Sequence, residues 1–286
     1  MANLKEIRNR ISSIGSTMKI TNAMKMVSAA KLKKAHDAIT AMRPYANKLT
    51  ELLQNLSATL DSNDGGVYTE QREVNKVLIV AITSNRGLCG SFNSSVIKKV
   101  RNIITTQYAG KEVSILAIGK KGNDLLGKKF AIYSNESEVY DELNFENVSN
   151  IANKMMEQFA IGSFDKIELV YNQFKNAATQ ILTEEQFLPI LPPESKINSN
   201  TDYIFEPSKQ EIVKGLIPKS LKTQLYKAVR DSYASEHGAR MTAMHKATDN
   251  ATELRDDLLL IYNKARQAAI TNEILEIVGG AEALKG

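Results

Sequence analysis

The sequence predicts an α/β protein with a long antiparallel two-helix coiled coil, formed by the N- and C-terminal arms, and an inserted Rossmann-like α/β domain. Apolar residues near both ends of the chain repeat at alternating steps of three and four, which is the spacing of a coiled-coil seam. Between the ends, short apolar runs alternate with helical segments, as in α/β domains. We therefore expect an N-terminal coiled-coil helix at 1–60, the Rossmann-like domain at 70–195 and a C-terminal coiled-coil helix at 208–286.

The N-terminal arm carries the first predicted seam. One glycine and one proline, Gly15 and Pro44, interrupt its 60 residues. After Met18 the apolar stripe broadens into small and flexible side chains, including Met24, which indicates contact on more than one side of the helix. The helix is expected to end near Leu60, before a turn-forming run of Asp, Ser, Asn and Gly. The seam positions are Leu4, Ile7, Ile11, Ile14 and Met18.

The central region is predicted to be a mostly parallel α/β domain. The apolar run 77–82 is short and has polar neighbours, so it is expected to be a buried strand. Strands that alternate with helices favour parallel pairing through crossover connections. The expected strands are 77–82, 113–118, 167–171 and 179–190, and the expected helices are 93–106, 144–161 and a short helix after Gly119.

The C-terminal arm carries a second and more regular seam. No proline follows Pro218, so residues 219–278 are about 60 residues of potential helix, or about 90 Å at 1.5 Å per residue. A lone helix of that length would expose its seam to water, and the N-terminal arm is the available partner. The seam positions are Met244, Ala247, Ala251, Leu254, Leu258, Ile261, Ala265 and Ala268.

Composition and charge limit the classes of function. The net charge is +5, and residues 1–36 hold eight Lys and Arg against one acid. A basic helix favours an acidic partner, which leaves nucleic acid, anionic lipid and an acidic protein surface open. The start of the chain lacks the apolar run of a signal peptide, and no segment has the roughly 20 apolar residues that span a bilayer. Any membrane role is expected to be peripheral, and the single cysteine, Cys89, excludes an internal disulfide.

The turn at 83–93 is the one place where the sequence suggests a ligand. It follows a strand and precedes a helix, where α/β proteins hold phosphates. Its Arg86–Gly90 stretch, however, matches neither G-x-G-x-x-G nor G-x-x-x-x-G-K-[ST], so a tight structural turn is the better interpretation. No motif places a catalytic set or a metal-ligand cluster in this sequence. This absence agrees with a mechanical part rather than an enzyme, and no cofactor is expected.

Three long motifs resemble ATP synthase gamma subunits of the bacterial type. They are ISSIGSTMKITNAMKMVSAAK at 11–31, SNRGLCGSFN at 84–93, and the C-terminal pair EHGARMTAMHKATDNA at 236–251 and YNKARQAAITNE at 262–273. The resemblance implies a central rotor shaft of the rotary ATP synthase, which couples ion flow through the membrane ring to conformational cycling of the catalytic subunits for ATP synthesis. It implies alpha, beta and epsilon subunits and the membrane c-ring as partners, and a peripheral location on the cytoplasmic side of the cell inner membrane.

The resemblance also implies which residues contact partners. It puts Met24 close to the pair Arg266–Gln267 and to the catalytic subunits. The residues expected to contact the catalytic head are Met24, Lys25, Arg266, Gln267, Thr271 and Glu273, and those expected in the central domain and foot are Arg86, Cys89, Tyr203 and Phe205.

Two other functions fit parts of the sequence. One is a nucleotide-binding α/β enzyme with a helical arm, which would bind ATP or ADP stoichiometrically. The other is a basic coiled-coil module that binds nucleic acid, although the basic helix has no aromatic residue before Tyr45.

Overall fold

A computed structural model describes residues 4–57, 67–190 and 209–283. The chain divides into two compact units. The coil unit contains Met1–Ser28 and Met241–Gly286, and the α/β unit contains Ala29–Arg240. Tyr203 and Phe205 lie outside the described residues. Among the described residues, no helix has a segment long and apolar enough to span a bilayer.

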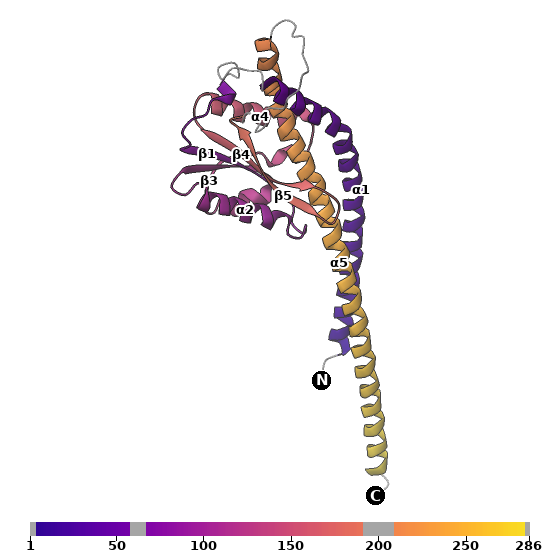
Figure 1. Cartoon of the computed structure of the whole chain (residues 1–286). Coiled ribbons are helices and arrows are strands. Elements are labelled where there is room, and N and C mark those ends of the chain that lie inside the picture. Colours follow the sequence, from indigo (N-terminus) through magenta and orange to yellow (C-terminus); the bar gives the residue numbers. More distant parts are fainter. Residues whose placement is uncertain (1–3, 58–66, 191–208, 284–286) are drawn as a thin grey trace. The chain divides into compact units, whose positions relative to one another are not determined.

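The α/β unit is built on one five-stranded sheet in the order β3-β2-β1-β4-β5 (Figure 1). β1, β2, β3 and β4 run parallel, and β5 joins β4 antiparallel at one edge. The elements in chain order are α1 (Leu4–Ser57), η1 (Val67–Thr69), β1 (Lys76–Ile82), α2 (Phe92–Thr106), β2 (Glu112–Ile118), α3 (Lys120–Leu126), β3 (Ala131–Asn135), η2 (Ser137–Tyr140), α4 (Phe145–Ala160), β4 (Lys166–Phe174), β5 (Gln180–Leu188) and α5 (Lys209–Ala283).

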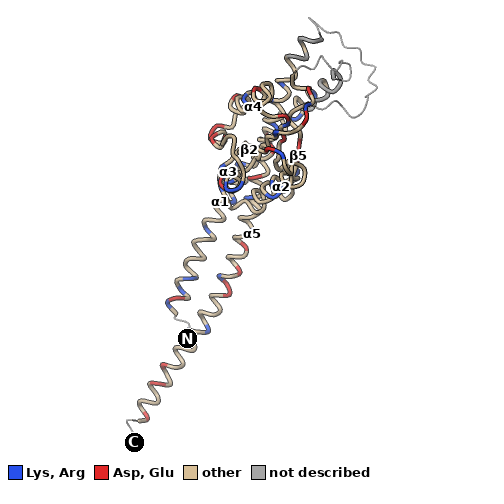
Figure 2. The backbone as a smooth tube through the Cα atoms, turned by 90° about the vertical axis from the view of Figure 1, so that its left-hand side faces the viewer, with Lys and Arg blue, Asp and Glu red and all other residues tan. Residues whose placement is uncertain are grey.

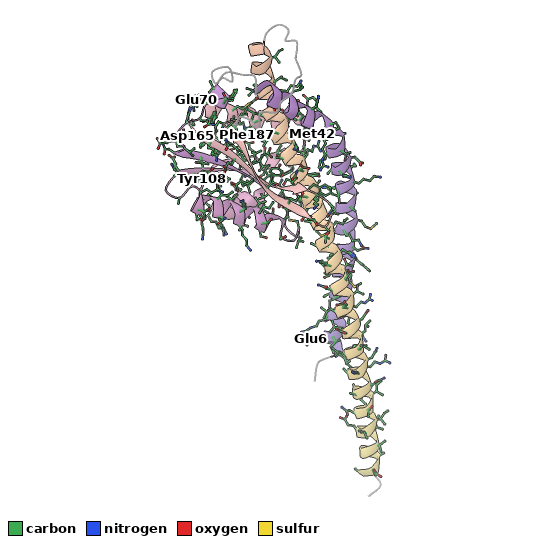
Figure 3. The ribbon with its side chains drawn as sticks, in the orientation of Figure 1. Glu6, Met42, Glu70, Tyr108, Asp165 and Phe187 are labelled. Atoms are coloured by element: carbon green, nitrogen blue, oxygen red, sulfur yellow. The ribbon has the colours of Figure 1, made fainter. Side chains whose placement is uncertain are left out.

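Helices cover both faces of this sheet, which is why its central strands are apolar throughout. All but the first residue of β1 are buried, as expected for a strand between two helical layers. α2 and α4 lie on opposite faces (Figure 1). Tyr108 belongs to the apolar cluster on the α2 face, whereas Phe187 belongs to the larger cluster formed with α4 and α5 (Figure 3).

The predicted fold class is confirmed, with two differences in the elements. The strand β3 was not predicted, because it is only five residues long and alternates between exposed and half-buried side chains. Helix α5 begins at Lys209 and continues through Pro218, although a proline inside a helix removes one backbone hydrogen bond. Helix α1 is described to Ser57, so its expected end near Leu60 lies outside the described residues.

The coil unit is an antiparallel pair of helices. An Nη2 nitrogen of Arg8 donates to the Tyr262 hydroxyl at 2.7 Å, and the hydroxyls of Thr21 and Thr248 are 2.7 Å apart. The α1 partner moves toward the C-terminus, from residue 8 to 21, while the α5 partner moves back from 262 to 248. This opposite progression establishes the antiparallel orientation and also fixes the register of the two arms.

Candidate partner-contact surfaces

The α1 side of the coil seam is confirmed and extends further than predicted. Ile7 is buried, and Leu4, Ile11, Ile14 and Met18 are half-buried at heptad spacing. The same spacing continues through Thr21 and Ser28, which are buried, and the half-buried Lys25. The seam therefore becomes polar toward the end of the α1 segment in the coil unit.

The predicted α5 side of the seam is wrong at three positions. Leu254, Ile261 and Ala268 are exposed. Their places are taken one residue later by half-buried side chains, namely Arg255, Tyr262 and Ala269. Arginine and tyrosine bury their apolar parts while their polar ends keep hydrogen-bond partners, so they can fill seam positions that an apolar pattern does not reveal. Tyr262 accepts its hydrogen bond from Arg8, and the arginine also lies over the tyrosine ring, 5.7 Å from its centroid.

The structure does not bring Met24 and Arg266 together. Because Thr21 pairs with Thr248, Met24 lies beside the part of α5 near Met244. Arg266 lies one turn beyond Tyr262, the partner of Arg8, and is therefore near the start of α1. The two sites are about 30 Å apart along α5 at 1.5 Å per residue, so the expected proximity is wrong.

The remaining predicted head contacts lie on the coil surface. Lys25 is half-buried beside Met24, and Arg266, Gln267, Thr271 and Glu273 are all exposed. The register leaves α5 without an α1 partner among the described residues beyond about Gln267. This unpaired end of α5, which we call the tip, has exposed apolar side chains at Ile270, Ile274, Leu275, Ile277 and Val278.

The two helices of the coil unit carry opposite charge. Residues 4–28 of α1 contain five Lys and Arg and one acid, whereas residues 241–283 of α5 contain four Lys and Arg and seven acids. Figure 2 shows Lys and Arg positions in blue and Asp and Glu positions in red along both helices of the pair. Apolar side chains are also exposed on both helices, among them Met26 and Leu260. The coil is consequently asymmetric around its axis in both charge and hydrophobicity.

In the α/β unit, the turn that joins β1 to α2 has an extensive internal hydrogen-bond network. Asn93 accepts from the Ser84 backbone N–H at 2.9 Å, and its amide donates to the Cys89 sulfur at 3.2 Å. Asn85 accepts from the Lys120 backbone N–H and donates to the Ser137 carbonyl. The side chain of Asn172 on β4 donates to the Phe92 carbonyl at 3.0 Å, so the chain's own polar groups bond to one another around this turn.

Cys89 and Arg86 occupy different places in this turn. Cys89 is 2% exposed, and burial raises the pKa of its thiol, so the sulfur is an unreactive packed group. Arg86 is exposed. The sequence interpretation of a tight structural turn therefore agrees with the geometry.

Helix α5 holds this turn through Arg240. Its guanidinium donates to the carbonyl oxygens of Arg86 at 2.9 Å and Gly87 at 3.3 Å. The same guanidinium forms an ion pair with Glu236 one helical turn earlier. Burial raises the pKa of Glu236, and the Arg240 charge opposes that rise. Burial, reinforced by Arg240 and Lys31, lowers the pKa of His237 to about 3, so this histidine is neutral beside the guanidinium.

Sequence reasoning did not select Arg240 or Glu236, although both lie in the motif at 236–251. The available signal was a Glu and an Arg four residues apart, on a helix segment otherwise rich in Ser, Ala and Gly. Among the described residues, no group of three or more His, Cys, Asp or Glu is arranged to hold a metal ion.

Comparison with known proteins identifies the family. A family model described as ATP synthase matches residues 3–284. The ATP synthase gamma chain of Flavobacterium johnsoniae is 72% identical over 287 residues, which cover 100% of both chains. The chain belongs to the ATP synthase gamma chain family. The gamma chain of a Geobacter species is also similar, at 42% identity over 288 residues and 100% of both chains.

Solved structures agree with this relationship. The central stalk and c-ring structure of the Tetrahymena thermophila mitochondrial ATP synthase contains a chain that is 27% identical, with a TM-score of 0.60, covering 80% of this chain and 99% of that one. A chain of the Euglena gracilis mitochondrial ATP synthase has a TM-score of 0.69 at 21% identity, covering 98% of this chain and 94% of that one, and supports the fold. The predicted family is thus confirmed, and the predicted role in the central stalk of a rotary ATP synthase is supported.

Proposed function

We propose that the chain is the central rotor shaft of a rotary ATP synthase, which couples ion flow through a membrane ring to conformational cycling of catalytic subunits. The observation that carries this proposal is the antiparallel coil with its fixed register and its unpaired α5 tip. Family membership supports it, because the relatives that match over their full length are gamma chains of this synthase.

The asymmetry of the coil provides the coupling. A rod with different charge and apolar surface on each side contacts each catalytic subunit of a surrounding ring differently. A contact can shift a subunit between conformations only by the difference in its interaction energy with them. Turning the rod therefore changes which conformation each subunit favours, and by linkage nucleotide binding and release bias the angle of the rod.

The tip acts as a bearing in this proposal. Its apolar side chains are largely exposed, up to 71% for Ile277, so one partner helix does not cover them. A surrounding apolar collar would bury them without directional hydrogen bonds, which would have to break at each step. The tip then stays centred while it turns.

The contact residues keep the roles that the family resemblance implies. On the coil, the proposed contacts with the alpha and beta subunits of the head are Met24, Lys25, Arg266, Gln267, Thr271 and Glu273. In the α/β unit, Arg86 and Cys89 belong to the turn proposed to meet a partner. The α/β domain and the end of the shaft nearer the membrane, which we call the foot, are proposed to bind the epsilon subunit and the c-ring. Tyr203 and Phe205 are proposed to contact partners at the foot.

The chain is proposed to be non-catalytic and to bind no cofactor, because the turn after β1 is occupied by the chain's own Asn93, Asn172 and Arg240. Catalysis would reside in the partner subunits. The complex would hold the chain peripherally on the cytoplasmic side of the cell inner membrane. The division into a helix at 1–60, a domain at 70–195 and a helix at 208–286 remains part of this proposal.

The test is ATP-driven ion pumping by membrane vesicles that carry the assembled synthase, with and without this chain. Pumping that depends on the chain supports the shaft. ATP hydrolysis and pumping that proceed unchanged without it would exclude the role. Micromolar, stoichiometric binding of ATP to the isolated chain by calorimetry would favour the nucleotide-binding enzyme instead. A salt-dependent gel shift with duplex DNA or tRNA at physiological ionic strength would favour the nucleic-acid module.

A further inference from the structure

A buried carboxylate lies where α1 packs against α5 in the α/β unit. Asp231 on α5 is 1% exposed, and neither of its oxygens has a hydrogen-bond partner among the described residues. The cation that faces it is Arg43 on α1, whose Nη2 nitrogen is 3.9 Å from an Asp231 oxygen. The same nitrogen donates to the Phe174 carbonyl at 3.4 Å, so the arginine is shared between two acceptors. A buried carboxylate that accepts no hydrogen bond is costly to ionise.

Helix α1 is the element that shields this carboxylate. A small apolar cluster joins α1 to α5 and β4 beside it, and among the described residues its buried members are Ala35, Ile39, Phe174 and Ala234. Asp231 lies about one helical turn from Ala234, and Arg43 about one turn from Ile39, so the carboxylate is at the margin of the cluster. Because the cluster is small, movement of α1 away from Asp231 exposes little apolar surface.

The backbone of α1 has a weak point beside Arg43. Pro44 is the next residue in the chain and lies inside the helix. Proline has no backbone N–H, so the helical hydrogen bond to the carbonyl of Thr40 is missing. Helix α1 is also bent rather than straight (Figure 1), as helices that contain proline commonly are. The part of α1 that covers Asp231 can therefore move without breaking a complete ladder of hydrogen bonds.

Charged groups on three elements act on the carboxylate. They are Arg43 of α1, Lys227 of α5 and Glu185 of β5. The Glu185 carboxylate accepts from the Tyr171 hydroxyl of β4 at 2.8 Å and from the Gln224 side chain of α5 at 2.7 Å, so this second negative charge is held in place. Burial raises the pKa of Asp231 to about 6, the two cations oppose this rise, and Glu185 reinforces it.

We propose that Asp231 is a proton-binding site that acts as a latch between α1 and α5. With the proton bound, α1 stays closed over a neutral carboxyl group; without it, α1 moves away near Pro44 and water reaches the carboxylate. The reason is linkage: the closed form desolvates the carboxylate and so binds the proton more tightly than the open form, and loss of the proton favours opening. Acidification therefore closes the latch. Both helices continue into the coil unit, but the latch does not require the shaft role.

The experiment measures amide hydrogen exchange of the full chain by mass spectrometry at pH 5 and pH 7.5. The informative peptide covers residues 38–46 of α1. After division by the intrinsic exchange rate, its protection in the parent should fall about fivefold to tenfold from pH 5 to pH 7.5, because opening returns the pKa of Asp231 from about 6 toward 3.8. Asp231→Asn cannot ionise, so its protection should be equal at both pH values.

Three controls separate the latch from other effects of pH. A peptide from α4, residues 145–160, should respond to pH alike in the parent and in Asp231→Asn, whereas a general change in stability would alter both peptides. His36 is a second titratable group on α1, with its ring 5.8 Å from that of Phe174, and His36→Gln should keep the pH response of the parent. Asp257→Asn, which removes an exposed acid from α5, should also keep it.

A second measurement keeps the test decisive if Asp231→Asn folds poorly. The carbon-13 signal of the Asp231 carboxyl group reports its midpoint pH directly. Arg43→Gln removes a cation that opposes protonation, so it should raise this midpoint by about 0.5–1 and move the opening of α1 to higher pH by the same amount. The proposal is overturned if Asp231→Asn keeps the pH response of the α1 peptide, if the α1 and α4 peptides of the parent respond equally, or if Arg43→Gln leaves the midpoint unchanged.

Discussion

Asp231 on α5 is a buried carboxylate whose ionisation should oppose folding. Asp231 is 1% exposed, and neither of its carboxylate oxygens has a hydrogen-bond partner among the described residues. Arg43 on α1 is the nearest cation, at 3.9 Å and partly in solvent. Burial raises the pKa of Asp231 from 3.8 to about 6, and the charges of Arg43 and Lys227 oppose that rise without cancelling it.

The shift gives the sign and size of a pH effect. Because the folded pKa is above the unfolded value, the folded state binds the proton more tightly. The stabilisation of the folded state by protonation of Asp231 is fully present below about pH 4 and is lost as the pH rises through about 6. A shift of about two pKa units corresponds to about 3 kcal/mol in total, of which about 1 kcal/mol is lost between pH 5 and pH 7.

The substitution Asp231→Asn removes the titrating group and keeps the shape. Urea unfolding of the parent and the variant at pH 5 and pH 7 measures the difference. The free energy of unfolding of the variant relative to the parent should rise by about 1 kcal/mol from pH 5 to pH 7. Asp257→Asn, at an exposed position on the same helix, should show no such change. An identical pH dependence in the parent and Asp231→Asn would refute the reasoning.

Three further predictions concern Gly119 at the end of β2, the seam and the tip. Gly119→Ala should lower the free energy of unfolding by about 2–6 kcal/mol, because φ is 113° and a β-carbon would collide with the Thr83 carbonyl oxygen. Gly110→Ala, where a β-carbon would meet open space, should cost about 1–3 kcal/mol. Equal losses in thermal unfolding would contradict this reasoning. Leu258→Ala should lower the free energy of unfolding by about 1–2 kcal/mol, because Leu258 is half-buried in the seam. Leu260→Ala, at an exposed position, should change it by no more than about 0.5 kcal/mol. The reverse order would contradict the register. Deletion of residues 283–286 should weaken assembly modestly and spare much ATPase activity, and full loss of activity in an assembled complex would argue against the bearing.

The α1 half of the coil could be predicted because its seam is built from large aliphatic residues at heptad spacing. The α5 half could not be predicted fully, because Arg255 and Tyr262 occupy seam positions through their apolar stems and ring. Apolar neighbours at Leu254 and Ile261 gave a regular pattern that is one residue out of place. Polar seam residues whose partners lie on another helix leave little signal in a single sequence.

The same limit applies to the α/β unit. β1 was predictable because its interior position makes it a continuous apolar run, whereas β3 is short and at an edge. Arg240 donates hydrogen bonds to the carbonyl oxygens of Arg86 and Gly87, which are 154 and 153 residues away in the chain. These bonds depend on how α5 packs in the α/β unit, so a single sequence does not reveal them. The motif at 84–93 did not reveal that Leu88 rather than Cys89 reaches solvent.

The most direct test of the shaft is to watch this chain turn. The complex is fixed to a surface by its catalytic head, and a bead is attached through a new cysteine at Asn102, which is exposed on α2, while Cys89 is 2% exposed and should escape labelling. With ATP, a rotor shaft should turn the bead continuously in one direction. A bead that stays at a fixed angle while the same complexes hydrolyse ATP would contradict it.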